Sequence, residues 1–374
     1  MHRGDSSFFV GEIQSCRFVR TTEHTHQPVC KRMSTQQPPF VIVIMAVRNE
    51  ATFIERSLGA VLQQDYPTDR MEVIVADGMS DDGTREILAQ YAATTPHLRL
   101  IDNPNKIVST ALNRAIAEAR GEIIVRVDGH TIIEPNYVRE CVAALQRTGA
   151  DNVGGRMQAI GSGALAEAIA LATSSPFGVG GARFHYSERK EWVDTVYMGA
   201  WPRRVFDAIG GFDKEMVPNQ DEEFNYRLRG QGGRILLVPS IKSFYYCRNS
   251  LKALSWQYWQ YGYGKVRVTQ KHPRQMRLRQ FVPAAFVSTL ARSLLAGGFT
   301  AIGWMPFGGF LVHTSSAILQ PRRLQQKSAG TCFRSRLRDA AAFVWTRVHG
   351  WTGSLCGQVG SAGEGAAHRV DCPT

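Results

Sequence analysis

The chain has 374 residues, enough for one large domain with an appendage, and 44% of them are hydrophobic, which is ample for a core. Its formal net charge of +12 is unevenly spread, since residues 1–224 hold 23 Lys and Arg against 29 Asp and Glu, whereas residues 225–374 hold 21 against 3. The seven cysteines are scattered and form no CxxC pair, which excludes a disulfide framework or a zinc site and indicates reduced thiols in a cytosolic setting.

Composition divides the chain into four regions. Residues 1–39 are polar and lack both periodicity and the apolar core of an export signal, so we expect a disordered tail, with Met33 as an alternative start. Residues 40–280 carry regular apolar patterns and form the predicted domain. Residues 281–319 are mostly apolar, and residues 320–374 form a basic tail to which we assign no role.

The first half of the domain alternates strands and helices. Short apolar runs predict strands at 41–46, 72–76, 97–101 and 123–127, and helical spacing predicts helices at 53–62, 85–91 and 108–119. This alternation indicates an α/β fold, with a mostly parallel sheet covered by helices on both faces.

The second half is less regular. We predict helices at 164–172, 203–209, 221–229 and 251–263, and strands at 192–199 and 234–238. Residues 265–279 then hold six basic residues and no acid. In 281–319, the stretch 293–312 has about the 20 uncharged residues that a membrane span needs, although glycines make it a poor helix. It is interpreted as a membrane-embedded or interfacial segment, with a hydrophobic loop bundle in water as the alternative.

Acidic residues follow two of the predicted strands. Asp77 opens the loop ADGMSDDGT, which suits a nucleotide held by carboxylates, although an ordinary Asp/Gly turn would have the same composition. The loop lacks the lysine of a P-loop and the GxGxxG spacing of a dinucleotide site. Asp128 and His130 flank Gly129, so both side chains can meet one Mg²⁺ or Mn²⁺ ion, and a capping Asp with a surface His is the alternative. Such an ion could bridge the phosphates of a nucleoside diphosphate.

Three consecutive acids open the helix predicted at 221–229. The helix dipole stabilises acids in a first turn, which is a sufficient reason for Glu222 and Glu223. Asp221, at the start of the helix and near glycine-rich loops, is the one that we expect to face a cleft as a general base.

These motifs together resemble the family 2 glycosyltransferases. The resemblance covers residues 40–279 and is carried by VRNE at 47–50, the ADGMSDDGT loop, the strand that ends in DGH, the GGFD turn at 210–213, and DEEF at 221–224 followed by Arg227. Within the family, the phrases DGH, NQDEEFNYR and QYWQYGYGK are similar to exopolysaccharide glucosyltransferases of the succinoglycan type.

The resemblance implies a GT-A fold and inverting transfer from a nucleoside diphosphate sugar. Asp221 matches the catalytic base, and Asp128 with His130 stands where the family has Asp-x-Asp and binds Mn²⁺ or Mg²⁺. Residues implied to bind the nucleotide sugar are Val47, Asn49, Glu50, Asp77 and Asp128, and those implied on the acceptor side are Gly199, Gln257 and Tyr261. Gln260 replaces the Arg of the Gln-x-x-Arg-Trp motif, which argues against a long-chain synthase.

The expected activity is transfer of one hexose, with UDP-glucose favoured as donor, to a lipid-linked or oligosaccharide acceptor in exopolysaccharide or cell-envelope glycan synthesis. The basic run at 265–279 favours a membrane surface as partner rather than nucleic acid. We therefore expect the enzyme at the cytoplasmic face of the plasma membrane. A polyprenyl-phosphate sugar transferase is the alternative enzyme. The alternative of another class is a nucleic-acid-binding protein that uses its basic, aromatic C-terminal part.

Overall fold

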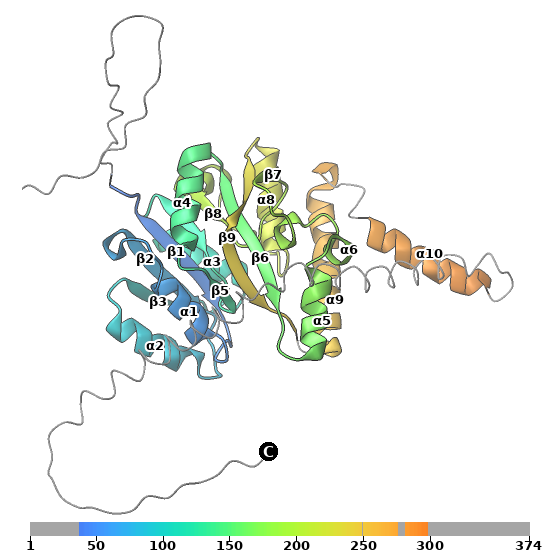
Figure 1. The fold of residues 1–374 in the computed structure, drawn as a ribbon, viewed down its shortest axis with the longest axis horizontal. Coiled ribbons are helices and arrows are strands. Elements are labelled where there is room, and N and C mark those ends of the chain that lie inside the picture. Colours follow the sequence, from blue (N-terminus) through green and yellow to red (C-terminus); the bar gives the residue numbers. More distant parts are fainter. Residues whose placement is uncertain (1–36, 249, 276–280, 298–374) are drawn as a thin grey trace, which may run out of the picture.

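The computed structural model describes residues 37–248, 250–275 and 281–297 (Figure 1). Most of the predicted N-terminal tail, the end of the apolar segment from residue 298 onward and the whole basic tail lie outside the described residues.

A nine-stranded sheet runs through the molecule in the order β3-β2-β1-β4-β8-β6-β9-β5, and β7 pairs with β9 beside this path. The strands are β1 (Val41–Val47), β2 (Met71–Asp77), β3 (Leu98–Asp102), β4 (Ile123–Arg126), β5 (Thr131–Ile133), β6 (Asn152–Ile160), β7 (Glu191–Val193), β8 (Ala200–Pro202) and β9 (Ile235–Tyr246). The first four strands are parallel, as predicted. The other half is mixed, because β8 runs antiparallel to both β4 and β6. The sheet as a whole is therefore mixed rather than mostly parallel.

Helices cover both faces of the sheet, as the alternating pattern predicts. They are α1 (Ile54–Leu62), α2 (Thr84–Thr94), α3 (Val108–Glu118), α4 (Tyr137–Thr148), α5 (Ala164–Thr173), α6 (Pro176–Val179), α7 (Arg203–Ile209), α8 (Gln220–Gly230), α9 (Leu251–Lys271) and α10 (Val282–Gly297). One core packs α1, α2 and α4 against the sheet, and the other packs α3, α7 and α8 against its opposite face. In Figure 1, α9 and α10 (orange) lie at the end of the sheet away from β3.

The central strands are fixed by apolar burial. Every residue of VIVIMAV in β1 except Ala46 is buried, and alternate side chains enter the two cores. Each fully buried Val or Ile contributes about 1.5–3 kcal/mol relative to an exposed one. Four aromatic rings, those of Trp201, Phe206, Phe212 and Phe224, pack on one another in the second core, with centroid distances of 4.7–6.2 Å. This aromatic cluster lies beneath the start of α8.

The strand predicted at 192–199 is wrong. The structure has two three-residue strands, β7 and β8, separated by an irregular segment. Met198 and Gly199 both have positive φ, 59° and 123°, which is incompatible with a continued pleat. Val196 and Met198 of this segment are buried nonetheless, so its apolar residues resemble a strand in the sequence. Conversely, β9 and α9 are longer than predicted, with 12 and 21 residues.

Across the described ranges, no helix combines the length and the hydropathy that crossing a bilayer requires.

Candidate active site

The four parallel strands all end at one edge of the sheet, and their loops meet there. The loop after β1 is joined to the loop after β2 by paired hydrogen bonds between Asn49 and Asp81, of 2.9 and 3.1 Å. The backbone N–H of Glu50 donates to Thr84 Oγ1 at 2.9 Å, and that of Ala51 donates to Asp82 at 3.1 Å. The two loops therefore form one rigid rim, in which Asn49 has a positive φ of 55°.

Asp77 lies in the floor of this rim with a fully buried side chain. Its carboxylate accepts hydrogen bonds from Arg85 Nη1 at 2.5 Å and from the Ser80 hydroxyl at 2.5 Å. Arg85 also pairs with Asp102 at the end of β3, at 2.8 Å. Asp77 thus ties the ends of β2 and β3 together, and Val47, buried at the end of β1, lies beside it in register.

Arg126 brings the predicted metal ligand and the predicted base together. Its Nε donates to Asp128 Oδ1 at 2.8 Å, and its Nη1 lies 3.9 Å from Asp221 Oδ2. The arginine side chain is only 4% exposed, whereas those of Asp128 and Asp221 are 14% and 31% exposed. Two carboxylates from distant parts of the chain therefore share the buried guanidinium of Arg126 where the parallel strands end.

This environment shifts the pKa values of Asp128 and Asp221 in opposite directions. Burial raises the pKa of Asp221 above the ordinary value for an aspartate, and the charge of Asp128 adds to this effect, although Arg126 opposes it. Burial would also raise the pKa of Asp128, but the charges of Arg126 and His130 and the hydrogen bond from Arg126 lower it below its ordinary value. Asp128 is thus suited to bind a cation, and Asp221 to take up a proton.

The imidazole of His130 makes a polar contact with Glu50, and not the expected shared contact with Asp128. The Nδ1 atom of His130 lies 2.9 Å from Glu50 Oε1. Burial lowers the pKa of His130, but the hydrogen bond to Glu50 and the charge of Asp128 outweigh it and raise that pKa. A carboxylate on Nδ1 leaves Nε2 as the ring atom that can bind a metal, which is how metal-binding histidines are commonly oriented.

Asp128 and His130 are the residues expected to bind a divalent ion. Among the described residues, no group of three or more His, Cys, Asp or Glu side chains gathers that could hold a metal. Asp128 and the Nε2 atom of His130 would supply two ligands, which fits a Mg²⁺ or Mn²⁺ ion that takes its remaining ligands from phosphate and water.

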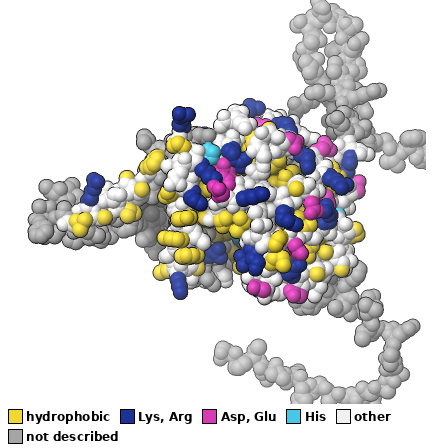
Figure 2. Space-filling view, turned by 180° about the vertical axis from the view of Figure 1, so that it is seen from behind, with side chains coloured by type: hydrophobic (Ala, Val, Ile, Leu, Met, Phe, Trp, Pro, Cys, Tyr) yellow, Lys and Arg dark blue, Asp and Glu magenta, His cyan; other side chains and the backbone are white. Residues whose placement is uncertain are grey.

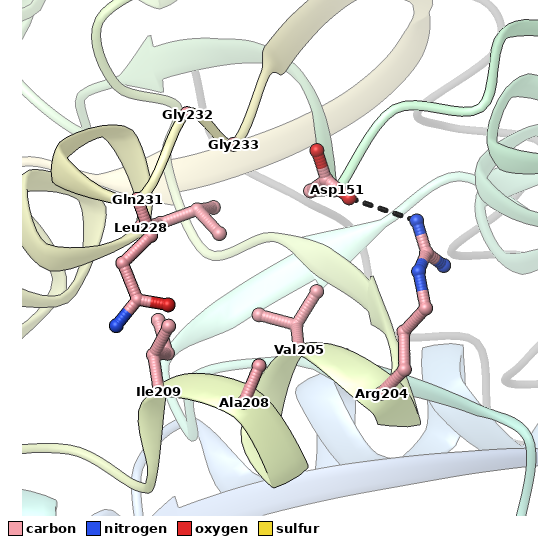
Figure 3. A pocket seen from close by; sticks show the side chains of 9 residues that line it. All are labelled: Asp151, Arg204, Val205, Ala208, Ile209, Leu228, Gln231, Gly232 and Gly233. Carbon is pink, nitrogen blue, oxygen red and sulfur yellow. Dashed lines mark hydrogen bonds and ion pairs between the residues drawn. The ribbon is translucent and has the colours of Figure 1, made fainter.

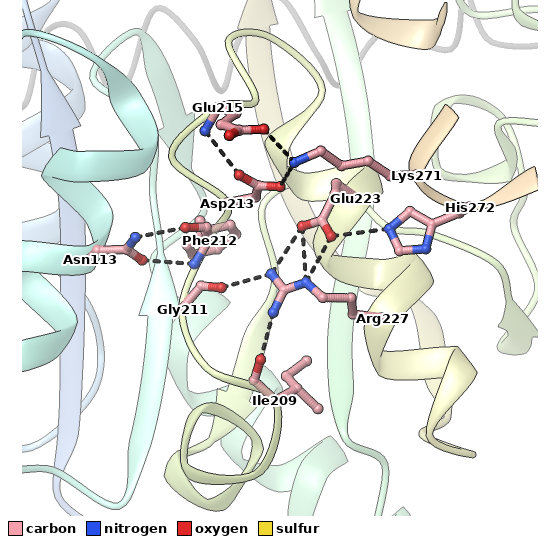
Figure 4. A network of polar contacts seen from close by, with 10 residues as sticks. All are labelled: Asn113, Ile209, Gly211, Phe212, Asp213, Glu215, Glu223, Arg227, Lys271 and His272. Carbon is pink, nitrogen blue, oxygen red and sulfur yellow. Dashed lines mark hydrogen bonds and ion pairs between the residues drawn. The ribbon is translucent and has the colours of Figure 1, made fainter. Parts of the chain in front are cut away.

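Helix α8, which carries Asp221 in its first turn, is anchored by Glu223 and Arg227 (Figure 4). Glu223 is 2% exposed and accepts hydrogen bonds from Arg227 Nε at 2.8 Å and Nη2 at 2.9 Å. Arg227 also donates to the carbonyls of Ile209 and Gly211, at 2.6 and 2.7 Å. Glu222 instead pairs with Lys265 of α9. The two following acids therefore anchor the helix that carries Asp221.

Helix α9 carries Gln257 and Tyr261, the two residues of this helix that the resemblance implies on the acceptor side. The side-chain amide of Gln257 donates to the hydroxyls of Tyr245 and Tyr261, at 2.9 and 3.0 Å. The ring of Tyr245 lies edge-on to His130, with centroids 5.6 Å apart. Burial raises the pKa of Tyr261, and the charges of Tyr245 and Asp221 raise it further, so Tyr261 lies within electrostatic reach of Asp221.

Gly199 occupies a position that other residues would disturb. A Cβ atom there would lie 2.5 Å from Trp201 Cζ2 and 2.7 Å from Asn152 Oδ1. Its carbonyl accepts the backbone N–H of Arg126 at 3.0 Å. Gly199 therefore supports the strand end that carries Arg126.

A cavity of about 390 Å³ lies at the opposite edge of the sheet (Figure 3). It is lined by α7, by Leu228 near the end of α8, and by residues that precede β6 and β9, and it includes the ion pair of Asp151 and Arg204 at 2.8 Å. None of the predicted site residues lines it, so we do not assign the chemistry to this cavity.

Arg126, Tyr197 and Tyr245 were missed by the sequence interpretation. Arg126 had a signal, because it is a charged residue inside the apolar run IIVRV. Tyr197 approaches Asp128 and pairs with Thr131 at 2.7 Å, but it comes from the misassigned segment 192–199. Tyr245 lies beyond the predicted end of its strand, so no spacing rule brings it near His130.

The chain is similar in sequence to known glycosyltransferases. The sequence pattern described as "Glycosyl transferase family 2" matches residues 42–209. "Succinoglycan biosynthesis protein ExoA" of Rhizobium meliloti is 34% identical over 266 residues, which cover 71% of this chain and 79% of that protein. A Methanococcus voltae enzyme, "Dolichyl N-acetyl-alpha-D-glucosaminyl phosphate 3-beta-D-2,3-diacetamido-2,3-dideoxy-beta-D-glucuronosyltransferase", is 27% identical over 62% of this chain and 74% of its own.

A solved structure extends the similarity to the fold. The mannosyltransferase PcManGT of Pyrobaculum calidifontis, determined with GDP-Man and Mn²⁺, superimposes with a TM-score of 0.50 over 85% of this chain and 84% of its own, at 20% identity. Its sequence identity is low, so it supports the GT-A-like fold alone. With the ExoA relative covered over more than two thirds of its length, the chain belongs to the family 2 glycosyltransferases and is a glycosyltransferase enzyme.

Proposed function

We propose that this enzyme transfers a hexose, with inversion, from a nucleoside diphosphate sugar to a lipid-linked glycan acceptor. The observation that carries the proposal is the sharing of Arg126 by Asp128 and Asp221, because it brings a cation-binding carboxylate and a proton-accepting carboxylate to one edge. UDP-glucose is the favoured donor, and exopolysaccharide synthesis is the favoured setting. The name of the ExoA relative supports that setting.

The reaction follows from these positions. Asp221 removes the proton from an acceptor hydroxyl, and the oxygen attacks the anomeric carbon from the face opposite the diphosphate. The bond from that carbon to the diphosphate oxygen breaks, the nucleoside diphosphate leaves with the electron pair, and the configuration inverts. The raised pKa of Asp221 favours proton uptake, since a base works best when its pKa is not far below the working pH.

Asp128 and His130 would hold a divalent ion, with Glu50 orienting the imidazole. Charge neutralisation of the departing diphosphate is the chemistry that such an ion supplies when bound. The rim residues Asn49 and Asp77 would position the nucleotide, Asp77 indirectly, because its side chain is fully buried.

The exposed face of α9 supports a membrane-bound acceptor. Trp256 stacks on Trp259 with centroids 4.9 Å apart, and Trp259 stacks on Tyr263 at 5.9 Å. These rings are 56–59% exposed, whereas the opposite side of α9 carries Gln257 and Tyr261 toward the site. Tryptophan and tyrosine are enriched where proteins meet the bilayer interface. Figure 2 shows hydrophobic side chains gathered on this side of the molecule. We propose that the enzyme acts at the cytoplasmic face of the plasma membrane.

A donor screen with the full chain tests the proposed reaction. UDP, GDP and dTDP sugars are offered with a lipid-linked acceptor extract, with and without Mn²⁺, and release of the nucleoside diphosphate is measured. We expect Asp221→Asn to lower the rate by about 10²–10⁴-fold. The matched control is Asp207→Asn, on the exposed side of α7, which should behave like wild type. Unchanged transfer by Asp221→Asn would show that the base is misassigned.

Vesicle flotation tests the membrane assignment. The full chain should float with vesicles of phosphatidylglycerol and phosphatidylcholine, and the variant with Trp256→Ser and Trp259→Ser should float less. The control is Trp192→Ser, since Trp192 is also 50% exposed but lies on β7. Equal flotation of both variants would count against α9 as the contact. Bare polyprenyl phosphate, added as a competing acceptor, separates the alternative polyprenyl-phosphate transferase.

A further inference from the structure

We propose that Arg126 is a positioning residue for the transfer reaction, whose guanidinium fixes the base Asp221 relative to the diphosphate-side carboxylate Asp128. The inference rests on the proposed function, in which Asp221 is the base. Among the described side chains that form ion pairs, Arg126 is the one that reaches both carboxylates. Asp128 follows β4, whereas Asp221 lies in the first turn of α8. The distance between the two carboxylates therefore depends on the side chain that contacts both, which is Arg126.

Arg126 is anchored more firmly than either carboxylate. It is the last residue of the central strand β4, and its backbone N–H donates to the Gly199 carbonyl of the neighbouring segment. Its guanidinium lies over the Phe212 ring, with Cζ 5.9 Å from the centroid, and Phe212 packs in the aromatic cluster beneath α8. The cation is therefore held by the sheet and the core and not by the surface loops.

The guanidinium also has an unused donor. Within the described part of the chain, Nη1 of Arg126 is buried and has no hydrogen-bond partner. A buried charged donor without a partner costs free energy, and native proteins seldom tolerate it without a reason. Asp221 Oδ2 lies 3.9 Å from this nitrogen, about 1 Å beyond hydrogen-bond distance. A small movement of the base when the acceptor binds would complete this bond and leave the other carboxylate oxygen for the acceptor proton.

The fork geometry explains why an arginine is needed. Nε and Nη1 point along different directions of one rigid plane, so a single side chain can address two carboxylates at once. A lysine ammonium at this position would keep the positive charge but could not hold both partners at a fixed separation. Arg126→Lys consequently separates positioning from charge.

The test compares the Lys variant with wild type on two readouts. For Arg126→Lys we expect kcat to fall by about 10²-fold, while the donor KM and the binding of UDP with Mn²⁺, measured by calorimetry, change less than threefold. Combined with Asp221→Asn, the Lys substitution should lower the residual rate no further, because both changes disable the same step. Arg204→Lys, which alters an arginine paired with Asp151 at the opposite edge, is the control and should leave kcat unchanged.

The outcomes are distinguishable from failure of the proposed function. If Asp221→Asn transfers normally, the base assignment itself falls. If Asp221→Asn is inactive but Arg126→Lys retains wild-type kcat, only the positioning role is overturned. A loss that merely follows a lower folded fraction, monitored by thermal unfolding of Arg126→Lys and of Arg126→Gln, would also overturn it and leave Arg126 as a structural ion pair.

Discussion

The anchoring of α8 by Arg227 leads to a quantitative stability prediction. Replacing Arg227 with Met removes the guanidinium that contacts Glu223 and the carbonyls of Ile209 and Gly211 (Figure 4). Glu223 is 2% exposed, and in the variant it retains its contact with His272 Nε2 at 3.1 Å. A buried carboxylate is thereby left largely without its counter-charge.

The expected cost follows from the burial of this pair. Removing one partner of a buried ion pair destabilises proteins by about 3–5 kcal/mol, because the remaining charge stays out of water. For a domain of this size, 1 kcal/mol corresponds to roughly 2–4 °C in Tm. We expect the Arg227→Met variant to lose about 3 kcal/mol and to melt roughly 6–12 °C lower. Transfer should also slow, since α8 carries Asp221.

Thermal unfolding followed by circular dichroism measures this shift. The control is the double variant Glu223→Gln with Arg227→Met, in which the uncompensated charge is removed and part of the stability should return. Arg229→Met, on the same helix but 3.8 Å from the partly exposed Asp194, should cost less than about 1 kcal/mol. Equal melting of Arg227→Met and wild type would refute the anchoring role, and so would a double variant less stable than Arg227→Met.

Three further predictions concern the site itself. Since the folded-state pKa of Asp221 is raised, the protein is stabilised by this group at low pH and loses that stability as pH rises through the folded pKa. Asp221→Asn, which mimics the protonated form, should therefore melt above wild type at pH 7–8, and the difference should vanish near pH 4, about the ordinary Asp value. Gly199→Ala should cost about 2–4 kcal/mol in urea unfolding, because of its positive φ and the approach to Trp201. Glu50→Ala should weaken Mn²⁺ binding by roughly 10–100-fold in the presence of UDP, measured by electron paramagnetic resonance, because His130 loses its orienting carboxylate.

Each of these predictions has a contrary result. Asp221→Asn melting below wild type at pH 7–8 would mean that its ionised form stabilises the fold. Full stability of Gly199→Ala would show that the Trp201 ring moves without cost. Wild-type Mn²⁺ affinity in Glu50→Ala would separate His130 from the metal, and Asp128 would then be the remaining protein ligand.

The parallel half of the fold was readable from the sequence. Strands β1, β2 and β4 are mostly apolar, because both of their faces are covered, and such runs mark a buried parallel sheet. Parallel strands end at a common edge, so Asp77 and Asp128 could be assigned to one side of the sheet before any coordinates. The helix at 203–209 was also predicted with the bounds that α7 has.

Other features were decided by tertiary structure. The antiparallel entry of β8 depends on contacts between segments far apart in sequence, and no local pattern specifies them. The pairing of Glu50 with His130 joins the loop after β1 to the loop after β4, whereas the motifs had assigned Glu50 to the nucleotide sugar and His130 to the metal. Long-range register and side-chain direction settle such contacts.

Arg126 shows the boundary most clearly. The sequence by itself determined that a charged residue interrupts an apolar strand just before Asp128. Only the tertiary structure decided that this charge is shared with Asp221, because α8 and β4 pack together in the second hydrophobic core. Local apolar periodicity encodes the strands and their common edge, whereas the electrostatic connection between the two carboxylates exists only once the sheet and the helix have packed.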